Sequence, residues 1–235
     1  VFALRDPLRA SAYDSVQTAK QAGIHTIMIT GDSAETAKAI AIDVGLDNNI
    51  ITSKQLASMS DDEVKQMLPH LNVVARVLPT DKSRLVKLAK QLNWVVGMTG
   101  DGVNDAPAVK NADVGFAMGS GTEMTKESSD IVILDDNLAS VNKATLYGRT
   151  LFKSIRKFLV FQLTVNLSAI LVAFLGPFFG FDLPLTMTQL LWINIIMDTL
   201  AALAFAGEAA LSRYMLEKPI PKDEPLINGD MWSSI

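Results

Sequence analysis

The sequence predicts an α/β domain with a parallel sheet, followed by a long stalk helix and a hairpin of two transmembrane helices. Three observations support this fold. Up to residue 139, short apolar runs alternate with amphipathic helical patterns, as they do in the strand–helix units of a parallel sheet. Polar, ligand-like strings follow three of these runs. Beyond them come two apolar runs, each long enough for a bilayer core of ~30 Å, which needs about 20 residues.

The elements of the α/β domain follow in order along the chain. Strands are predicted at residues 24–29, 73–77, 94–98, 112–118 and 130–134. Helices are predicted up to Gly23 and at residues 34–44, 61–68 and 81–92. Ser60 and Glu63 form a capping-box pattern that starts the third of these helices. The glycine-rich residues 119–123 are interpreted as a tight turn into a further helix rather than as a phosphate loop.

The composition of the 235-residue chain narrows its possible classes. Hydrophobic residues make up 49%, which is too many for a disordered segment. The absence of cysteine excludes disulfides and thiolate metal sites, and it leaves the compartment open. A net charge of −4 argues against a general nucleic-acid binder.

The most informative string is Thr-Gly-Asp-Gly-Val-Asn-Asp-Ala-Pro at residues 99–107, which directly follows a predicted strand. Open parallel sheets place their ligand sites at the carboxyl ends of strands. Asp101 is therefore a candidate ligand of Mg²⁺, a cation that prefers carboxylate oxygens and usually comes with phosphate. The glycines on either side of Asp101 let the backbone approach a phosphate closely.

Two further strands end in groups that suit a phosphate. The strand at 24–29 leads into Thr30 and Gly31, which offer a hydroxyl and a backbone N–H. The strand at 73–77 is followed by Lys82, which offers an ammonium group. Taken singly, these residues could be an ordinary turn and a solvated lysine. Their order along the chain, together with the Asp101 string, predicts one phosphate site built from three loops.

The order of hydroxyl, lysine and Asp-x-x-x-Asp, carried by Thr30, Lys82, Asp101 and Asp105, resembles the haloacid dehalogenase superfamily. The strings at residues 30–32 and 99–107 resemble its P-type ATPase branch. This resemblance implies a haloacid-dehalogenase-like, Rossmann-like phosphorylation domain that forms an aspartyl-phosphate from ATP. By the same resemblance, Asp101 holds Mg²⁺ and Lys82 neutralises the phosphoryl group.

The resemblance assigns the remaining phosphate-site residues as follows. Asn104 and Asp105 support the metal and the phosphate. Thr30 and Gly31 hold the phosphoryl oxygens. Two more residues, Asp32 and Arg76, lie near the nucleotide.

The predicted membrane spans cover residues 158–180 and 186–207, within a stalk-and-membrane region at 140–207. The first span has no charged side chain, and the second has one, Asp198. The helical pattern starts at Leu138, so a helix of ~50 Å would project from the bilayer as a stalk. Five lysines and arginines lie in this stalk and three in the tail at 208–235, whereas the loop at 176–187 has none. The positive-inside rule therefore places the stalk, the tail and the phosphorylation domain in the cytoplasm.

Polar side chains inside the spans form a candidate cation site. Asn194 and Asp198 are four residues apart and share one helix face, and Gln162 and Asn166 of the first span have the same spacing. Their side-chain oxygens are the ligands that hard cations prefer. The alternative is hydrogen bonding between membrane helices through the same side chains.

The second span resembles the sixth membrane helix of calcium-pumping P-type ATPases at Asn194, Met197 and Asp198. Met197 is similar to the plasma-membrane branch, since the reticulum branch has threonine there. Ala169 stands where the reticulum branch has a glutamate that a second ion needs. The resemblance therefore implies a plasma-membrane pump that carries one Ca²⁺ per cycle through Asn194, Asp198 and Asn166.

The family's phosphorylated aspartate lies in an Asp-Lys-Thr-Gly-Thr string that this sequence does not contain. We therefore expect the chain to act with other domains of the same pump, namely the actuator, the nucleotide-binding domain and further membrane helices, in a lipid bilayer. Alone it should be inactive. The alternatives are a membrane-anchored phosphatase or pseudoenzyme of the superfamily, a P-type pump for another cation, and a truncated regulator that inserts beside an intact pump.

Overall fold

The computed structural model describes residues 8–181 and 185–232. They form two compact units. The first unit runs through Ala144 and also includes Met215–Lys222. The second comprises Thr145–Tyr214 and the residues from Asp223 onward.

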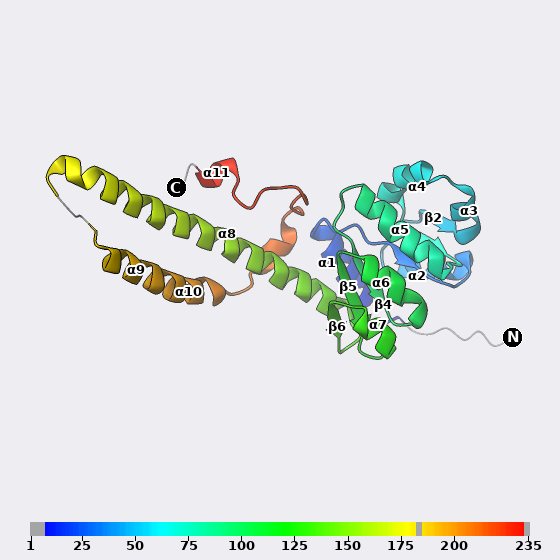
Figure 1. Ribbon diagram of the computed structural model, residues 1–235. Helices are drawn as coiled ribbons and strands as arrows, with labels where there is room; N and C mark the ends of the chain where they lie inside the picture. The colour runs from blue at the N-terminus through cyan, green and yellow to red at the C-terminus, as the bar shows by residue number, and fades with distance from the viewer. Residues whose placement is uncertain (1–7, 182–184, 233–235) are drawn as a thin grey trace. The chain divides into compact units, whose positions relative to one another are not determined.

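Two parallel, three-stranded sheets form the centre of the first unit (Figure 1). One sheet has the order β1-β3-β2, and Val73 of its middle strand pairs with Met28 and Ile50. The other has the order β4-β5-β6, with Thr99 opposite Phe116. The strands are β1 (Met28–Ile29), β2 (Ile50–Thr52), β3 (Val73–Ala75), β4 (Gly97–Gly100), β5 (Val114–Met118) and β6 (Ile131–Ile133).

Helices connect these strands, as parallel pairing requires. The connecting helices are α2 (Ala34–Asp43), α3 (Ser53–Ser58), α4 (Asp61–Met67), α5 (Pro79–Gln91), α6 (Ala106–Asn111) and α7 (Glu123–Glu127), and α1 (Ala12–Gln21) precedes β1. The 3₁₀ turns η1 (Leu68–His70) and η2 (Val103–Asp105) precede β3 and α6. The predicted capping box of α4 is confirmed, because Ser60 Oγ accepts from Glu63 N and the Glu63 carboxylate accepts from Ser60 N.

Three details differ from the sequence prediction. The elements β2, α3 and α6 were not predicted from the sequence, although Thr52 and Gln55 form a capping box that could have located α3. The strand predicted at 94–98 is placed too early, because Trp94 and Val96 pack on the hydrophobic core and β4 begins only at Gly97. The first strand is shorter than predicted, since only the last two residues of the apolar run pair with β3.

Helix α5 packs against both sheets. Leu85 and Leu88 lie in a core cluster with Val74 of β3, and Val86 lies in another cluster with Met98 of β4. All five side chains are buried. Burial of each side chain stabilises the folded state by about 1.5–3 kcal/mol relative to an exposed position. One helix therefore holds the two sheets together.

The second unit is built from long apolar helices. Helix α8 (Leu138–Leu175) continues from the first unit, is 38 residues long and spans about 57 Å at 1.5 Å per residue. It is followed by η3 (Gly176–Phe179), α9 (Met187–Ile196), the π-helical segment η4 (Met197–Ala201), α10 (Ala202–Ala206), η5 (Ser212–Leu216) and α11 (Gly229–Trp232). The helical stretches Leu138–Phe179 and Met187–Ala206 are long and apolar enough to cross a membrane.

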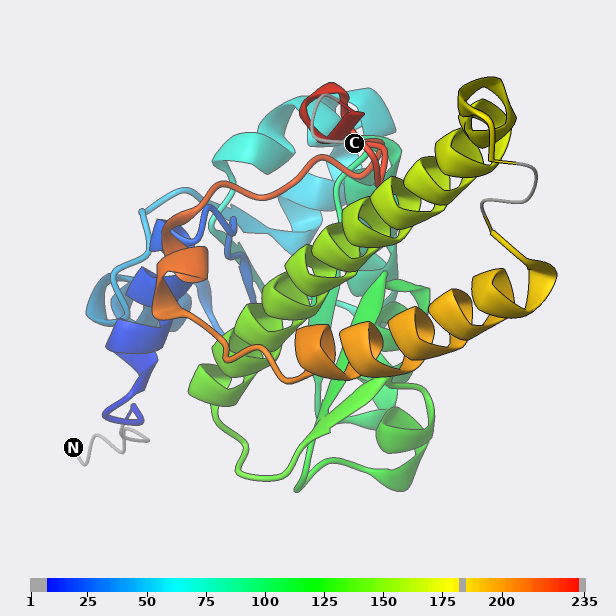
Figure 2. The same ribbon diagram turned by 90° about the vertical axis from the view of Figure 1, so that its left-hand side faces the viewer.

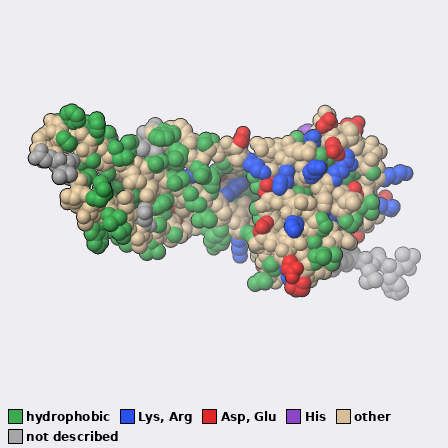
Figure 3. Space-filling model, viewed as in Figure 1, with side chains coloured by type: hydrophobic (Ala, Val, Ile, Leu, Met, Phe, Trp, Pro, Cys, Tyr) green, Lys and Arg blue, Asp and Glu red, His purple; other side chains and the backbone are tan. Residues whose placement is uncertain are grey.

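The two apolar stretches of the second unit meet where α10 packs against α8 and diverge toward the start of α9 (Figure 2). Phe205 of α10 packs against Phe158 and Phe161 of α8, with ring centroids 6.3 and 6.0 Å apart. Hydrophobic side chains cover their outer surface, whereas charged side chains gather over the first unit (Figure 3). An apolar surface of this kind is stable in lipid and unfavourable in water.

Basic residues of the stalk bind the segment that follows the second apolar stretch. Arg156 forms an ion pair with Glu224 at 2.9 Å and donates to the carbonyl of Leu226. Lys157 is paired with Glu208, and the Arg149 guanidinium donates to the carbonyl of Tyr214. The positive-inside rule used these residues only for their charge. In the structure, several of them also hold the tail through ion pairs and hydrogen bonds.

Asp113 connects the start of β4 with the same tail inside the first unit. Its carboxylate accepts from Val96 N at 2.9 Å and from Lys222 Nζ at 2.9 Å, with Lys90 Nζ at 3.4 Å. Partial burial raises the pKa of Asp113, but these three donors outweigh it and hold the pKa below its ordinary value of 3.8. A carboxyl group with a depressed pKa stabilises the fold above its unfolded-state pKa, and this contribution is lost as the pH falls through the folded-state pKa.

We therefore expect Asp113→Asn to lower the melting temperature at pH 7, and the difference from wild type to shrink as the pH falls below 3.8. Thermal unfolding in detergent at several pH values measures this. Asp62→Asn is the matched control, because Asp62 forms an exposed ion pair that contributes little. A difference for Asp113→Asn that stays constant with pH would contradict the assignment.

Candidate active site

A partly buried ion pair joins the carboxyl ends of the two sheets. Lys82 lies in the first turn of α5, just after β3, and its Nζ is 2.5 Å from Asp105 Oδ1. The other carboxylate oxygen of Asp105 accepts from Asp101 N, directly after β4, at 3.3 Å. The side chain of Asp105 is 9% exposed and that of Lys82 is 19% exposed. The structure therefore brings together three of the predicted residues, although they come from different loops.

Gly100 makes this arrangement possible. A Cβ atom built on Gly100 would lie 2.5 Å from Asp105 Cβ and 2.9 Å from Val109 Cγ2. Gly102, on the other side of Asp101, has nothing within 4 Å of the same position. The two glycines, which the sequence analysis treated alike, differ in this respect: Gly100 leaves the space that Asp105 occupies.

The second predicted loop places Thr30, Asp32 and Arg76 next to one another. Thr30 Oγ1 donates to Asp32 Oδ2 at 2.8 Å and accepts from Asp32 N at 3.2 Å. Arg76 N donates to the carbonyl of Asp32 at 3.0 Å, and Arg76 adopts a φ of +54°, which is uncommon for a residue other than glycine. Gly31 between them is exposed, with open space around its Cα. The loop thus exposes Gly31 at the end of β1, while the Thr30 hydroxyl is bonded to Asp32.

The start of α2 adds an electrostatic feature beside this loop. The pKa of Glu35 is lowered by its own backbone N–H at the helix start, by the Ser33 hydroxyl and by the nearby charge of Arg76. Free N–H groups at a helix start favour negative charge.

The residues around Asp101 fit a hard cation that completes its shell from elsewhere. Asp101 and Asn104 are both exposed and present oxygen atoms, while the charge of Asp105 is balanced by Lys82. Over residues 8–181 and 185–232, no group of three or more His, Cys, Asp or Glu side chains could hold a metal ion by itself. Mg²⁺ suits such a site, since it keeps several waters and shares its other ligands with substrate phosphates.

Sequence reasoning missed the contact between this loop and the glycine-rich turn before α7. Thr122 N donates to the carbonyl of Asp101 at 2.8 Å, and Thr125 Oγ1 donates to the carbonyl of Gly102 at 2.8 Å. The turn was expected to be only a tight connection. Its Gly-Thr sequence before a helical pattern indicates an N-cap, but no sequence signal shows which carbonyl Thr125 reaches.

The predicted cation ligands of the apolar helices are not joined by hydrogen bonds as the phosphate-site residues are. Asn166 is half-buried in α8, and Asn194 is exposed in α9. No hydrogen bond joins them in the part of the chain that the structure describes. The side chain of Asp198 lies outside the described residues, but its backbone belongs to the π-helical segment η4 rather than to a regular α-helix. Such segments are rare and frequently occur at functional sites.

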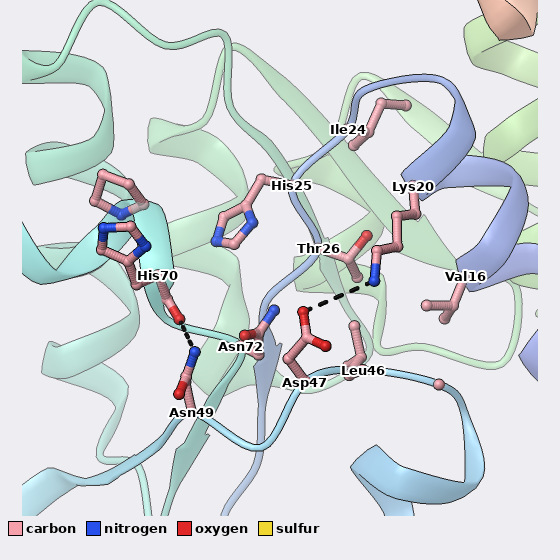
Figure 4. Close-up of a pocket in the computed structure, with 12 residues that line it drawn as sticks. Val16, Lys20, Ile24, His25, Thr26, Leu46, Asp47, Asn49, His70 and Asn72 are labelled. Carbon is pink, nitrogen blue, oxygen red and sulfur yellow. Dashed lines mark hydrogen bonds and ion pairs between the residues drawn. The ribbon is translucent and has the colours of Figure 1, made fainter.

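A separate hollow of about 180 Å³ lies at the amino ends of β1 and β3, and both histidines line it (Figure 4). His25 Nε2 is 2.8 Å from the carbonyl of Leu71, and the carbonyl of His70 accepts from Asn49 Nδ2. Both contacts hold neighbouring loops together.

Comparisons with known proteins extend this description. Residues 1–113 match the model of the haloacid dehalogenase-like hydrolases, and residues 182–235 match that of the cation-transporting ATPase C-terminus. The chain is 45% identical to "Calcium-transporting ATPase 12, plasma membrane-type" of Arabidopsis thaliana, covering 100% of this chain and 24% of that protein. It is also 45% identical to "Calcium-transporting ATPase 3, plasma membrane-type" of Oryza sativa subsp. japonica, covering 100% of this chain and 23% of the relative. The chain thus spans about a quarter of the length of these relatives.

The crystal structure of a zinc-transporting PIB-type ATPase in the E2.Pi state is also similar. It has a TM-score of 0.64 and 25% identity, and the match covers 90% of this chain and 28% of that one. The predicted fold, a haloacid-dehalogenase-like domain with a long helix and a second apolar helix, is confirmed.

The glycine geometry leads to a test of the site. We expect Gly100→Ala to lower the free energy of unfolding by about 1–3 kcal/mol, because the new methyl group must displace Asp105 or Val109. The matched variant Gly102→Ala, with open space at its Cβ, should change it by less than about 0.5 kcal/mol. Denaturant unfolding in detergent measures both, and equal effects would contradict the packing role of Gly100.

Proposed function

Because the chain belongs to the P-type cation-transporting ATPases, we propose that it is the part of a plasma-membrane Ca²⁺ pump that carries the phosphate site and two membrane helices. The pump would move Ca²⁺ with ATP through an aspartyl-phosphate intermediate. The observation that carries the proposal is the joining of Lys82, Asp105 and Asp101 at one edge of two parallel sheets. The two membrane-length helices of the same chain support it.

In this proposal Lys82 stabilises the phosphoryl group as it passes from ATP to an aspartate oxygen and ADP leaves. Asp105 keeps the ammonium in place from a buried position. Thr30 and Gly31 would donate a hydroxyl and an N–H to the phosphoryl oxygens, after Thr30 exchanges its bond to Asp32 for one to phosphate. Donors that are held before the reaction stabilise developing charge better than mobile ones.

The same loops would position the nucleotide and its metal. Asp101 and Asn104 would hold Mg²⁺, which supplies charge neutralisation at the phosphates when bound. Asp32 and Arg76 would lie near the nucleotide. Arg76 is exposed and already anchored to the Asp32 loop through its backbone N–H.

The aspartate that accepts the phosphoryl group must come from another part of the pump. Strands β1 and β4 each have one edge without a partner strand within the described residues, and α5 covers both sheets. An additional strand could pair there and carry the aspartate between Thr30 and Asp101. The nucleotide-binding domain, the actuator and the other membrane helices would likewise be partners, and the chain alone would not form a phosphoenzyme.

The Ca²⁺ site would use oxygen atoms of Asn166, Asn194 and Asp198. The π-helical turn at Asp198 supports this assignment, since it interrupts regular backbone bonding at this position. Because Ala169 provides no oxygen ligand from its side chain, we propose one Ca²⁺ per cycle. The phosphate site would face the cytoplasm, where ATP is present.

The role of Lys82 can be tested in the full-length pump. We expect Lys82→Met to reduce acid-stable phosphoenzyme formation from labelled ATP by about 10²–10³-fold, because a charge that stabilises the transition state is lost. Lys87→Met is the matched control: Lys87 is an exposed lysine of the same helix and should leave labelling unchanged. Equal labelling in the two variants would rule out the proposed role of Lys82.

The ion can be tested by the same assay in vesicles. Labelling of the wild type should require micromolar Ca²⁺, and Asp198→Asn should raise the Ca²⁺ needed for half-maximal labelling by at least about tenfold, since a charged ligand is lost. Thr199→Ser, in the same π segment, is the control. Labelling that does not depend on Ca²⁺ and is unchanged in Asp198→Asn would favour a pump for another cation or an anchored phosphatase. A transport ratio of two Ca²⁺ per ATP would overturn the single-ion proposal.

A further inference from the structure

Thr125 is a fully buried residue of α7 whose hydroxyl reaches the Asp101 loop. Its relative exposure is 0%, although it lies only a few residues from exposed ones. Its Oγ1 donates to the carbonyl of Gly102 at 2.8 Å and lies 2.8 Å from Thr122 Oγ1. Buried hydroxyl groups are nearly always hydrogen-bonded, so these two partners explain why a polar side chain is tolerated at this position.

The Gly102 carbonyl connects the Thr125 hydroxyl to Asp105, the acidic partner of the ion pair with Lys82. It accepts from Asp105 N at 2.8 Å as well as from Thr125 Oγ1. Both of its lone pairs are therefore used, one by the residue that holds Lys82 and one by α7. Removing the hydroxyl would leave the carbonyl with one donor and would free one side of the loop.

Hydrogen bonds also fix the backbone of Asp101, at its N–H and at its carbonyl. Its N–H donates to Asp105 Oδ2 at 3.3 Å, and its carbonyl accepts from Thr122 N at 2.8 Å. A Cβ on Gly121 would lie 3.0 Å from that carbonyl, so the turn packs closely against the loop. The backbone is thus fixed, while the Asp101 carboxylate remains exposed.

We propose that Thr125 is a positioning residue for the Asp101 carboxylate, acting through the Gly102 carbonyl. The proposal rests on the proposed function, in which Asp101 holds Mg²⁺. Residues that orient metal ligands change metal affinity or activity by about 10–100-fold when they are altered. Because Thr125 acts through one backbone bond, we expect the lower end of that range.

The test uses the full-length pump and two measurements. The first is the Mg²⁺ concentration that gives half-maximal phosphoenzyme labelling. The second is hydrogen exchange of the segment at residues 99–106, with and without Mg²⁺ and in the absence of ATP. Thr125→Val removes the hydroxyl and keeps the branched shape. We expect it to raise the half-saturating Mg²⁺ about tenfold and to reduce the protection that Mg²⁺ gives the segment.

Three further variants separate positioning from general stability. Thr125→Ser keeps the hydroxyl and should stay within about twofold of wild type. Thr125→Ala removes the hydroxyl without adding bulk and replaces Thr125→Val if that variant does not fold. Thr150→Val is the matched control, because Thr150 is 5% exposed and its hydroxyl also donates to a carbonyl, that of Leu146 in α8. It should leave the Mg²⁺ requirement unchanged.

The outcomes distinguish this proposal from the proposed function. Unchanged half-saturating Mg²⁺ and unchanged Mg²⁺ protection in the variants without the hydroxyl, with wild-type labelling intact, would overturn the role of Thr125 alone. A lower labelling maximum at the same Mg²⁺ requirement would also overturn it, since it indicates only a less stable protein. Failure of the wild-type pump to form a Mg²⁺-dependent phosphoenzyme would overturn the proposed function itself.

Discussion

The ion pair between Lys82 and Asp105 is the interaction on which the rest of the first unit depends. It lies where two parallel sheets end, and its carboxylate is nearly buried. Removing one partner of a buried pair leaves an uncompensated charge and typically destabilises a protein by about 3–5 kcal/mol. The surrounding sequence accommodates this constraint. Gly100 leaves space for the carboxylate, and α5 is anchored on both sheets so that Lys82 reaches across.

The loops at this edge combine a rigid backbone with exposed functional groups. Asp101 is held at its N–H and its carbonyl, while its carboxylate stays exposed. The Thr30 hydroxyl, in contrast, is already hydrogen-bonded to Asp32. In the proposed site, the Asp101 carboxylate would be free to bind a cation, whereas Thr30 would have to exchange its partner before it could bind phosphate.

The second unit follows a different constraint. In lipid, backbone polar groups must bond within their own helix, so α8, α9 and α10 are helical almost throughout. The exception is the π-helical turn that contains Asp198, the one charged residue of the predicted span. In the stalk part of α8, Arg156 and Lys157 pair with Glu224 and Glu208. These pairs organise the chain as it leaves the second stretch.

The sequence by itself determined the order of most elements, the two apolar stretches and the residue types at the site. These are properties of short segments: a capping box at Ser60, a polar string after an apolar run, a long run without charge. Only the tertiary structure decided that Lys82 bonds Asp105, that Gly100 and Gly102 differ, and that Thr125 reaches the Gly102 carbonyl. The tertiary structure also set the bounds of β1 and β4, which were misplaced, and the presence of the short β2 and α3. Pairing with a neighbour, rather than periodicity, defines so short a strand. The physical reason is that these contacts join residues far apart in sequence, whose meeting depends on how the sheets and α5 pack together.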